Sequence, residues 1–189
     1  MWQEEKELIN ALKFGEEKAY QLLVDAYSRR IYNLCLRLVP SQQDAEDTTQ
    51  EIFTTIYLSI ASFRTESSLS TWIYRIAINK CREFNRRKSR KKRFGMMYSW
   101  EETHEEFHAS SIQNPEKSLL NSELGQIMLF SIENLPENQR IAFTLSKLEG
   151  MKNEIISNTM EISISAVESL LFRAKKSVIR QMNDYLKND

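Results

Sequence analysis

Glycine and proline are scarce in this chain: its 189 residues include 4 glycines and 3 prolines. Since these residues interrupt helices more strongly than any others, their scarcity favours long, continuous helices. Apolar residues make up 41% of the chain and charged residues 28%, which excludes collagen-like, low-complexity and wholly disordered sequences. The length suffices for one hydrophobic core or two small ones.

The apolar residues are dispersed, and no run approaches the roughly 18–20 residues that a membrane span needs. The amino-terminal residues also lack the basic and then apolar pattern of a secretory signal. The sequence therefore predicts a soluble, cytoplasmic protein without membrane insertion. Cys35 and Cys81 lie in apolar helical patterns, without the spacing of a disulfide framework or a metal-binding CxxC motif, so we expect reduced core residues.

The charges balance overall, with 26 basic and 26 acidic side chains, but they are segregated along the chain. Every charged residue between positions 40 and 51 is acidic, whereas the segment from 72 to 93 is basic, with Glu83 as its single acid. Between 94 and 117 the helical periodicity fades within polar and acidic residues. We interpret this last segment as an acidic linker.

Apolar residues on the amino-terminal side recur at spacings of three, four and seven, which indicates amphipathic helices rather than strands. Pro40 ends one of these helices and Asp44 begins the next, while Ser70 is expected to cap a basic helix that starts near Thr71. The buried stripe of the middle helix is predicted to consist of Ile52, Phe53, Ile56, Tyr57 and Ile60. The inward side of the basic helix is predicted to carry Ile73, Ala77, Cys81 and Phe84.

The carboxy-terminal part, from about Leu119, reads as four helices, and no strand pattern or internal repeat stands out. The last two have the dimensions of a helix-turn-helix: residues 152–160, a short turn, and a longer helix capped by Ser163. A recognition helix in a major groove presents its first outward residues to base edges and nearby basic residues to phosphates. The predicted inward residues of the longer helix are Val167, Leu170, Leu171, Ala174 and Val178.

Several short segments together carry a family resemblance. In the first half these are DAEDTTQEIF at 44–53, FR at 63–64 and STWIYRIAIN at 70–79; in the second half they include LP at 135–136 and SLLFRAK at 169–175. In order and spacing they are similar to bacterial RNA polymerase sigma factors of the extracytoplasmic-function (ECF) group, the two-domain members of the main sigma family. The resemblance covers nearly the whole chain.

This resemblance implies an all-α fold of two small helical domains: sigma region 2 at residues 1–93, a flexible acidic linker at 94–117, and the helix-turn-helix of sigma region 4 at 118–189. It implies a sigma factor, not an enzyme, that binds core RNA polymerase through the β′ clamp helices and the β subunit and directs it to specific promoters. Promoter DNA and an anti-sigma factor are the other implied partners, and no cofactor or metal is implied. The linker is expected either to run through a basic channel of polymerase or to be a solvated tether.

The acidic helix, by this resemblance, docks on the clamp helices of polymerase, where opposite charge aids encounter and register. The residues carried over to this surface are Asp44, Asp47, Gln50 and Glu51. A solvated helix start would explain these acids alone, but not their order with the later segments.

The loop after residue 62 and the basic helix resemble the part of a sigma factor that opens and reads the minus-ten promoter element. Bases that leave a duplex need stacking or polar partners, and their phosphates need cations. The candidates are Phe63, Arg64, Ser67, Ser68, Trp72, Arg75, Asn79, Lys80, Arg82 and Arg86. Trp72 fits a core position at the loop–helix junction equally well, and the basic run at 86–93 also fits a solvated helix end.

The carboxy-terminal domain resembles the module that binds the duplex minus-thirty-five element. The residues carried over are Lys152, Asn153, Ala166, Glu168, Ser169, Phe172, Arg173 and Lys176. Glu168 and Ala166 depart from the basic residue and the threonine usual there, and an acid can accept from cytosine N4 but cannot hold a phosphate. Glu161 stands where glycine is common, so a left-handed backbone at this turn would be strained.

Two alternatives compete with this interpretation. The segment HEEFH at 104–108 fits HExxH, in which two histidines bind zinc and a glutamate acts as base, but it lacks the apolar face that holds such a helix in a core. A DNA-binding regulator that acts without polymerase would explain the helix-turn-helix but not the acidic and basic helices before it. A sigma-like regulator that has lost initiation is a variant of this second alternative.

Overall fold

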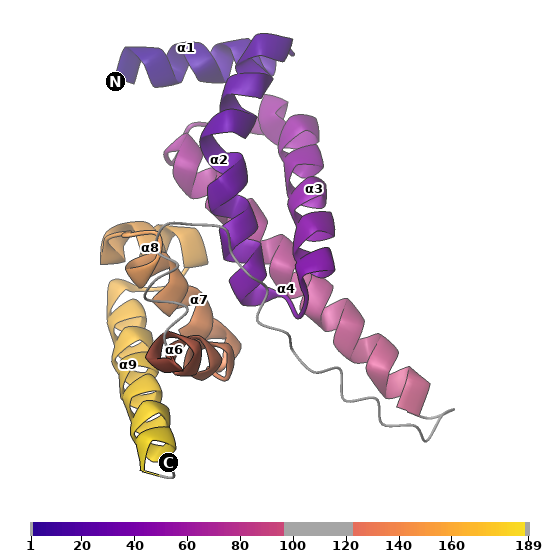
Figure 1. Ribbon diagram of the computed structural model, residues 1–189. Helices are drawn as coiled ribbons and strands as arrows, with labels where there is room; N and C mark the ends of the chain where they lie inside the picture. Colours follow the sequence, from indigo (N-terminus) through magenta and orange to yellow (C-terminus); the bar gives the residue numbers. More distant parts are fainter. Residues whose placement is uncertain (1, 97–122, 188–189) are drawn as a thin grey trace. The chain divides into compact units, whose positions relative to one another are not determined.

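The computed structural model describes residues 2–96 and 123–187, and every regular element within these ranges is a helix (Figure 1). The chain divides into two compact units, Met1–Thr103 and His104–Asp189. The predicted all-helical fold of two domains is therefore confirmed. The predicted linker at 94–117 begins inside a helix that continues to Met96, and its remainder lies outside the described residues.

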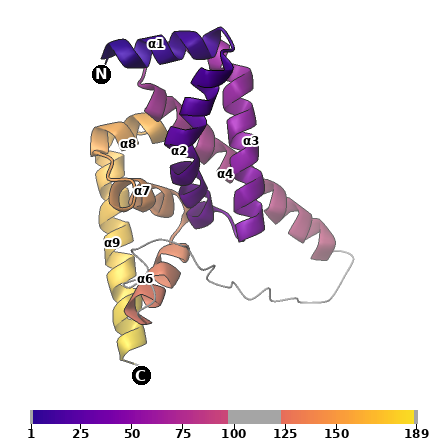
Figure 2. The ribbon, with the colours of Figure 1, turned by 45° about the horizontal axis from the view of Figure 1, so that its top comes forward.

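The first unit consists of α1 (Trp2–Lys13), α2 (Glu17–Leu38), α3 (Gln42–Ser59), a short 3-10 turn η1 (Ile60–Ser62) and α4 (Leu69–Met96). Helices α2, α3 and α4 pack along one another, and α1 lies across the amino-terminal end of α2 (Figures 1 and 2). Helix α1 also contacts η1, which leads into the loop before α4. The start of the chain is thereby placed beside the loop at residues 63–68.

The core of this unit follows the helical period that the sequence shows. Side chains with almost no exposed surface come from α2, α3 and α4, and include Leu23, Ile31, Leu34, Ile52, Ile56, Ile73, Tyr74, Ala77 and Ile78. Cys35 and Cys81 are buried and free, with the Cys81 thiol donating to Cys35 Sγ at 3.8 Å, which confirms their predicted core position. The prediction for Tyr57 was wrong: its side chain is 56% exposed and packs edge-on against Tyr20 at the rim of the core.

Two helix starts differ slightly from the sequence prediction. Helix α3 begins at Gln42, because Ser41 Oγ accepts the Asp44 N–H at 3.1 Å and so acts as the N-cap. Helix α4 begins at Leu69 and not near Thr71, since Ser68 Oγ, in place of the predicted Ser70, accepts the Thr71 N–H at 3.1 Å.

The second unit consists of α6 (Glu123–Glu133), α7 (Glu137–Lys147), α8 (Asn153–Met160) and α9 (Ile164–Leu186), the four helices that the sequence predicts. Helices α6 and α7 lie on one side of α9, and α8 lies at its amino-terminal end (Figure 2). Their core contains Ile132, Leu135, Phe143, Ala174 and Val178, with Met182 packed against it.

None of the described helices is by itself long and apolar enough to cross a membrane. Helices α8 and α9 pass such a test only as a pair, joined through a bend of 103°. That bend is the turn of the helix-turn-helix, within the range of roughly 90–120° found for this motif.

The packing of α3 predicts that two substitutions on this helix change the free energy of unfolding by very different amounts. Ile52 has no exposed surface, so Ile52→Ala is expected to lower the free energy of unfolding by about 2–5 kcal/mol. Leu58 is 75% exposed, and Leu58→Ala is expected to change it by about 0.5 kcal/mol or less. Trp72 lies in the first unit, and the sequence has no tryptophan after position 100, so the change in Trp72 fluorescence in urea follows the unfolding of the first unit. Equal urea midpoints for the two variants would contradict this description of the core.

Candidate functional site

The first candidate surface is the acidic start of α3, which we call the α3 acidic surface: Asp44, Asp47, Gln50 and Glu51. Asp47, Gln50 and Glu51 are exposed, and Asp44 is partly buried. Spacings of three and four residues place these side chains on neighbouring turns of one helix face. Asp44 also lies in the first turn, where the helix dipole favours a negative charge.

Two of these acids form ion pairs with α4, which the sequence did not reveal. Asp44 Oδ2 lies 2.9 Å from Lys88 Nζ, and Glu51 Oε2 lies 3.3 Å from an Arg87 guanidinium nitrogen. Because both pairs are partly exposed to solvent, each contributes about 1 kcal/mol or less to the stability of the unit. They add surface contacts between α3 and α4, whose register is set by the buried side chains between them, while Asp47 accepts a hydrogen bond from Gln43 within α3 itself.

The second candidate surface begins with the loop at residues 63–68. Phe63 is 5% exposed and packs against Trp72, with the ring centroids 5.0 Å apart and the planes tilted by 39°. Phe63 is thus a core residue in this conformation, and direct contact with DNA would require the loop to move. Trp72 keeps part of its surface exposed, so it both supports the loop and remains available to a ligand. Arg64 and Ser68 are exposed, and Ser67 is partly exposed.

The outward side of α4 continues this surface, and we call it the α4 basic face: Arg75, Asn79, Lys80, Arg82 and Arg86. Asn79 and Arg86 are exposed, and the other three are partly exposed. Their spacings of three and four residues align most of them along one side of the helix, opposite the buried Ile73 and Ala77. The arrangement presents cations and an amide along one line, which suits a nucleic-acid strand.

The third candidate surface is the helix-turn-helix of the second unit. Helix α8 ends at Met160, and the next residue, Glu161, caps it with a φ of 57° and a ψ of 44°. This backbone is left-handed, the case in which the sequence predicts strain at this position. The turn is closed by the Ile162 N–H, which donates to the Ser157 carbonyl at 3.1 Å. Ser163 then caps α9 by accepting the Ala166 N–H at 3.2 Å, as the sequence predicted.

The start of α9 presents most of the predicted contact residues to solvent. Phe172 is 70% exposed, so its ring is available for an apolar contact. Glu168, Ser169, Arg173, Lys176 and, at the start of α8, Lys152 are also exposed, whereas Ala166 and Asn153 are partly exposed. Val167, Ala174 and Val178 are buried as predicted, but Leu170 and Leu171 are only partly buried.

Comparison with known families matches both units. The family description "Sigma-70 region 2" matches residues 23–91, and "Sigma-70, region 4" matches residues 126–178. Two proteins named "ECF RNA polymerase sigma-E factor", from Haemophilus influenzae and Escherichia coli K12, are each 35% identical to this chain over 173 residues. These alignments cover 90% of the chain and, respectively, 91% and 90% of the relatives.

The chain therefore belongs to the sigma-70 family of bacterial transcription factors. Within that family it is a member of the ECF RNA polymerase sigma factors. It is thus a sigma factor, which directs RNA polymerase to promoters, and its partners are core polymerase and promoter DNA.

Solved structures support the same fold. The sigma factor RpoE of Bartonella quintana, solved with the anti-sigma factor NepR, has a TM-score of 0.68 at 17% identity, covering 88% of this chain and 98% of that one. CnrH, solved with the cytosolic domain of CnrY, also has a TM-score of 0.68, at 15% identity, covering 95% of this chain and 97% of that one.

Because the backbone of Glu161 is left-handed, a substitution by glycine is expected to raise stability at this position and to lower it at Glu154 in α8. Glu161→Gly is expected to stabilise the second unit by about 1 kcal/mol, because glycine adopts this backbone without the steric strain of a Cβ. Glu154→Gly, in the first turn of α8, is expected to destabilise it by about 1 kcal/mol, because glycine is a poor helix former and the carboxylate that favours the positive end of the helix is lost. Amide hydrogen exchange in α8 would show slower exchange for the first variant and faster exchange for the second. Faster exchange in both variants would refute the role assigned to this turn.

Proposed function

We propose that this sigma factor binds polymerase through the α3 acidic surface, and that it reads the two promoter elements with separate units. Residues 1–93 act as region 2, residues 94–117 as the connection, and residues 118–189 as region 4. The observation that carries the proposal is the exposure of one suitable face in each unit: the α4 basic face, and the polar and aromatic start of α9. The helices behind each face are held by a buried core.

Docking on polymerase is assigned to acids on a rigid support. The buried side chains of α3 hold this helix against the core, and two ion pairs with Arg87 and Lys88 add surface contacts. Asp47 and Gln50 lie between the paired positions on the same exposed face. Opposite charge on the β′ clamp helices would speed encounter and fix the orientation of the complex. Contact with the β subunit is proposed from the family resemblance, without assignment to particular residues.

The docking assignment predicts that Asp47→Lys combined with Glu51→Lys weakens binding to core polymerase by about tenfold or more, because two attractive charges become repulsive. Fluorescence anisotropy of the labelled full chain with core polymerase at moderate salt measures this change. The matched control, Glu7→Lys with Asp25→Lys, alters the net charge equally at exposed positions on α1 and α2. An equal loss in the control would show a general charge effect and would count against a specific docking surface.

Reading of the minus-ten element is assigned to the loop and the α4 basic face. Bases released from the duplex would find an aromatic face at Trp72 and polar partners at Arg64, Ser67 and Ser68. Arg75, Asn79, Lys80, Arg82 and Arg86 would hold the phosphates of the same strand. Phe63 contributes by supporting Trp72 from beneath.

Reversing charges on the α4 basic face is expected to reduce promoter opening without reducing binding to core polymerase. Arg82→Glu with Arg86→Glu is expected to reduce open-complex formation, because two phosphate contacts are lost and repulsion is added. Permanganate reactivity of unpaired thymines measures opening, and anisotropy measures core binding, which is expected to be unchanged. The control Arg30→Glu changes an exposed charge on α2. Normal opening by the double variant would remove the α4 basic face from the mechanism.

Reading of the duplex minus-thirty-five element is assigned to α8 and α9. Phe172 offers an apolar contact to a thymine methyl group, and Glu168 can accept from cytosine N4. Ala166 and Ser169 lie on the same end of α9, where Arg173 and Lys176 are available for phosphates. Lys152 and Asn153, at the start of α8, would contact the flanking backbone.

The two promoter contacts act together because one chain carries both. Tethering turns the second contact into an intramolecular step, so two weak interactions give one specific complex. We assign no catalytic step to this chain: polymerase forms the phosphodiester bonds, in the cytoplasm where it works. The match of both units to sigma regions disfavours a regulator that acts without polymerase, since such a protein would leave the first unit unexplained. The HExxH pattern at 104–108 lies outside the described residues.

An anti-sigma protein is the remaining proposed partner. The Bartonella quintana factor with the same fold was solved with such a protein. A protein that covers the α3 acidic surface would compete directly with polymerase. Competition between core polymerase and the anti-sigma protein for this chain would test the proposal.

A further inference from the structure

A carboxylate from the first helix reaches the start of the helix that carries the basic face. Glu5 Oε1 accepts the backbone N–H of Leu69, the first residue of α4, at 2.9 Å. The first N–H groups of a helix have no acceptor within the helix, and its positive dipole end favours an anion. Glu5 therefore meets both requirements from a position 64 residues away in sequence.

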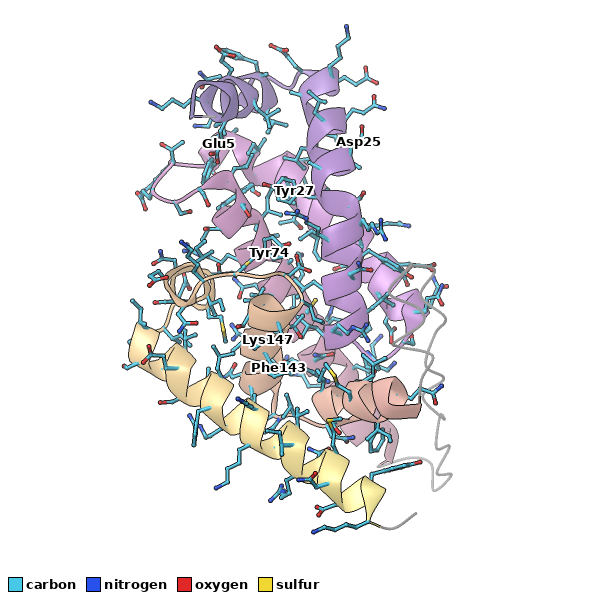
Figure 3. The ribbon with its side chains drawn as sticks, turned by 60° about the vertical axis from the view of Figure 1, so that its left-hand side comes forward. Glu5, Asp25, Tyr27, Tyr74, Phe143 and Lys147 are labelled. Carbon is cyan, nitrogen blue, oxygen red and sulfur yellow. The ribbon has the colours of Figure 1, made fainter. Side chains whose placement is uncertain are left out.

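The same helix end is fixed by two further side chains. Ser68 Oγ accepts the Thr71 N–H and lies 2.9 Å from Thr71 Oγ1. Ser70 hydrogen-bonds the Tyr27 hydroxyl of α2. Burial raises the pKa of the Tyr27 hydroxyl, while the Ser70 hydrogen bond lowers this pKa and the nearby Glu5 charge raises it by smaller amounts. Figure 3 shows Glu5 on the side of α1 that faces the start of α4, with Tyr27 nearby.

The loop that ends at this anchor is strained. Thr65 has a φ of 57°, a left-handed conformation that β-branched residues rarely adopt. Such a backbone persists only where the surrounding structure fixes it. The two ends of the loop are fixed differently: Phe63 packs on Trp72 at one end, and Glu5 holds Leu69 at the other.

We propose that Glu5 is a positioning residue for promoter reading: from α1, it holds the loop at 63–68 in the conformation that presents Arg64, Ser67 and Ser68 to the separated strand. This inference rests on the proposed function, in which that loop contacts the minus-ten element. Glu5 precedes the region 2 match at 23–91, so that match assigns it no role. Its action is indirect, through the backbone of Leu69.

The test uses holoenzyme assembled from the full chain and bacterial core polymerase. Promoter fragments with a randomised minus-ten segment are selected by open-complex formation, and sequencing gives the base preference at each position. Glu5→Ala is expected to reduce opening about tenfold and to flatten the preference, with binding to core polymerase unchanged. Glu5→Gln keeps an oxygen acceptor for the Leu69 N–H and is expected to restore most of the preference.

Two controls separate positioning from stability. Glu7→Ala removes an exposed carboxylate from the same helix and is expected to have no effect. Ile9→Ala removes a side chain that is 6% exposed, which loosens α1 but keeps the Glu5 carboxylate. If Ile9→Ala flattens the base preference as much as Glu5→Ala at an equal loss of melting temperature, the positioning role is overturned. A normal preference in Glu5→Ala also overturns it.

The experiment distinguishes this inference from the function on which it rests. Wild-type holoenzyme that shows no base preference, or an Arg82→Glu, Arg86→Glu variant that opens promoters normally, would overturn the proposed minus-ten reading itself. A clear wild-type preference that Glu5→Ala leaves intact overturns the role of Glu5 alone.

Discussion

The packing of α4 against α2 and α3 determines where the functional side chains of the first unit point. Ile73, Ala77 and Cys81 have almost no exposed surface, so the helical period directs Asn79 and Arg86 to the opposite side. The same packing brings Arg87 and Lys88 against the acids of α3. One buried stripe thus positions the basic face and holds the acidic surface in register.

The proximity of acids and bases in this unit bears on how polymerase binding and DNA binding are kept separate. Asp44 and Glu51 are partly neutralised by Lys88 and Arg87 of α4, which directly follow Arg86 in the chain but are not among the bases assigned to DNA. Glu83, the one acid of the basic segment, lies 3.9 Å from Lys80 and offsets part of its charge. Each surface therefore has its own set of charges, fixed by short contacts within the unit.

Local signals in the sequence predicted the helices, the N-cap at Ser163 and the position of the turn at Glu161. Each of these features depends on residues that are a few positions apart. The sequence did not distinguish Ser68 from Ser70 as the cap: Ser68 accepts the Thr71 N–H, while Ser70 hydrogen-bonds Tyr27 of another helix. The exposure of Tyr57 and the burial of Phe63 likewise depend on neighbours that periodicity does not specify. Glu5 gave no signal at all, since its partner is a backbone N–H far along the chain. The assigned polymerase and DNA contacts follow from family membership and remain predictions.

Helix α4 is continuous from Leu69 to Met96 and is held at two separate places: by Glu5 at its first residue, and by the ion pairs of Arg87 and Lys88 with α3 further along. At a rise of 1.5 Å per residue, Arg86 lies about 26 Å from Leu69 along the axis. Because an unbroken helix joins the two places, the distance between the loop at residues 63–68 and the far end of the α4 basic face is set by the number of residues between them.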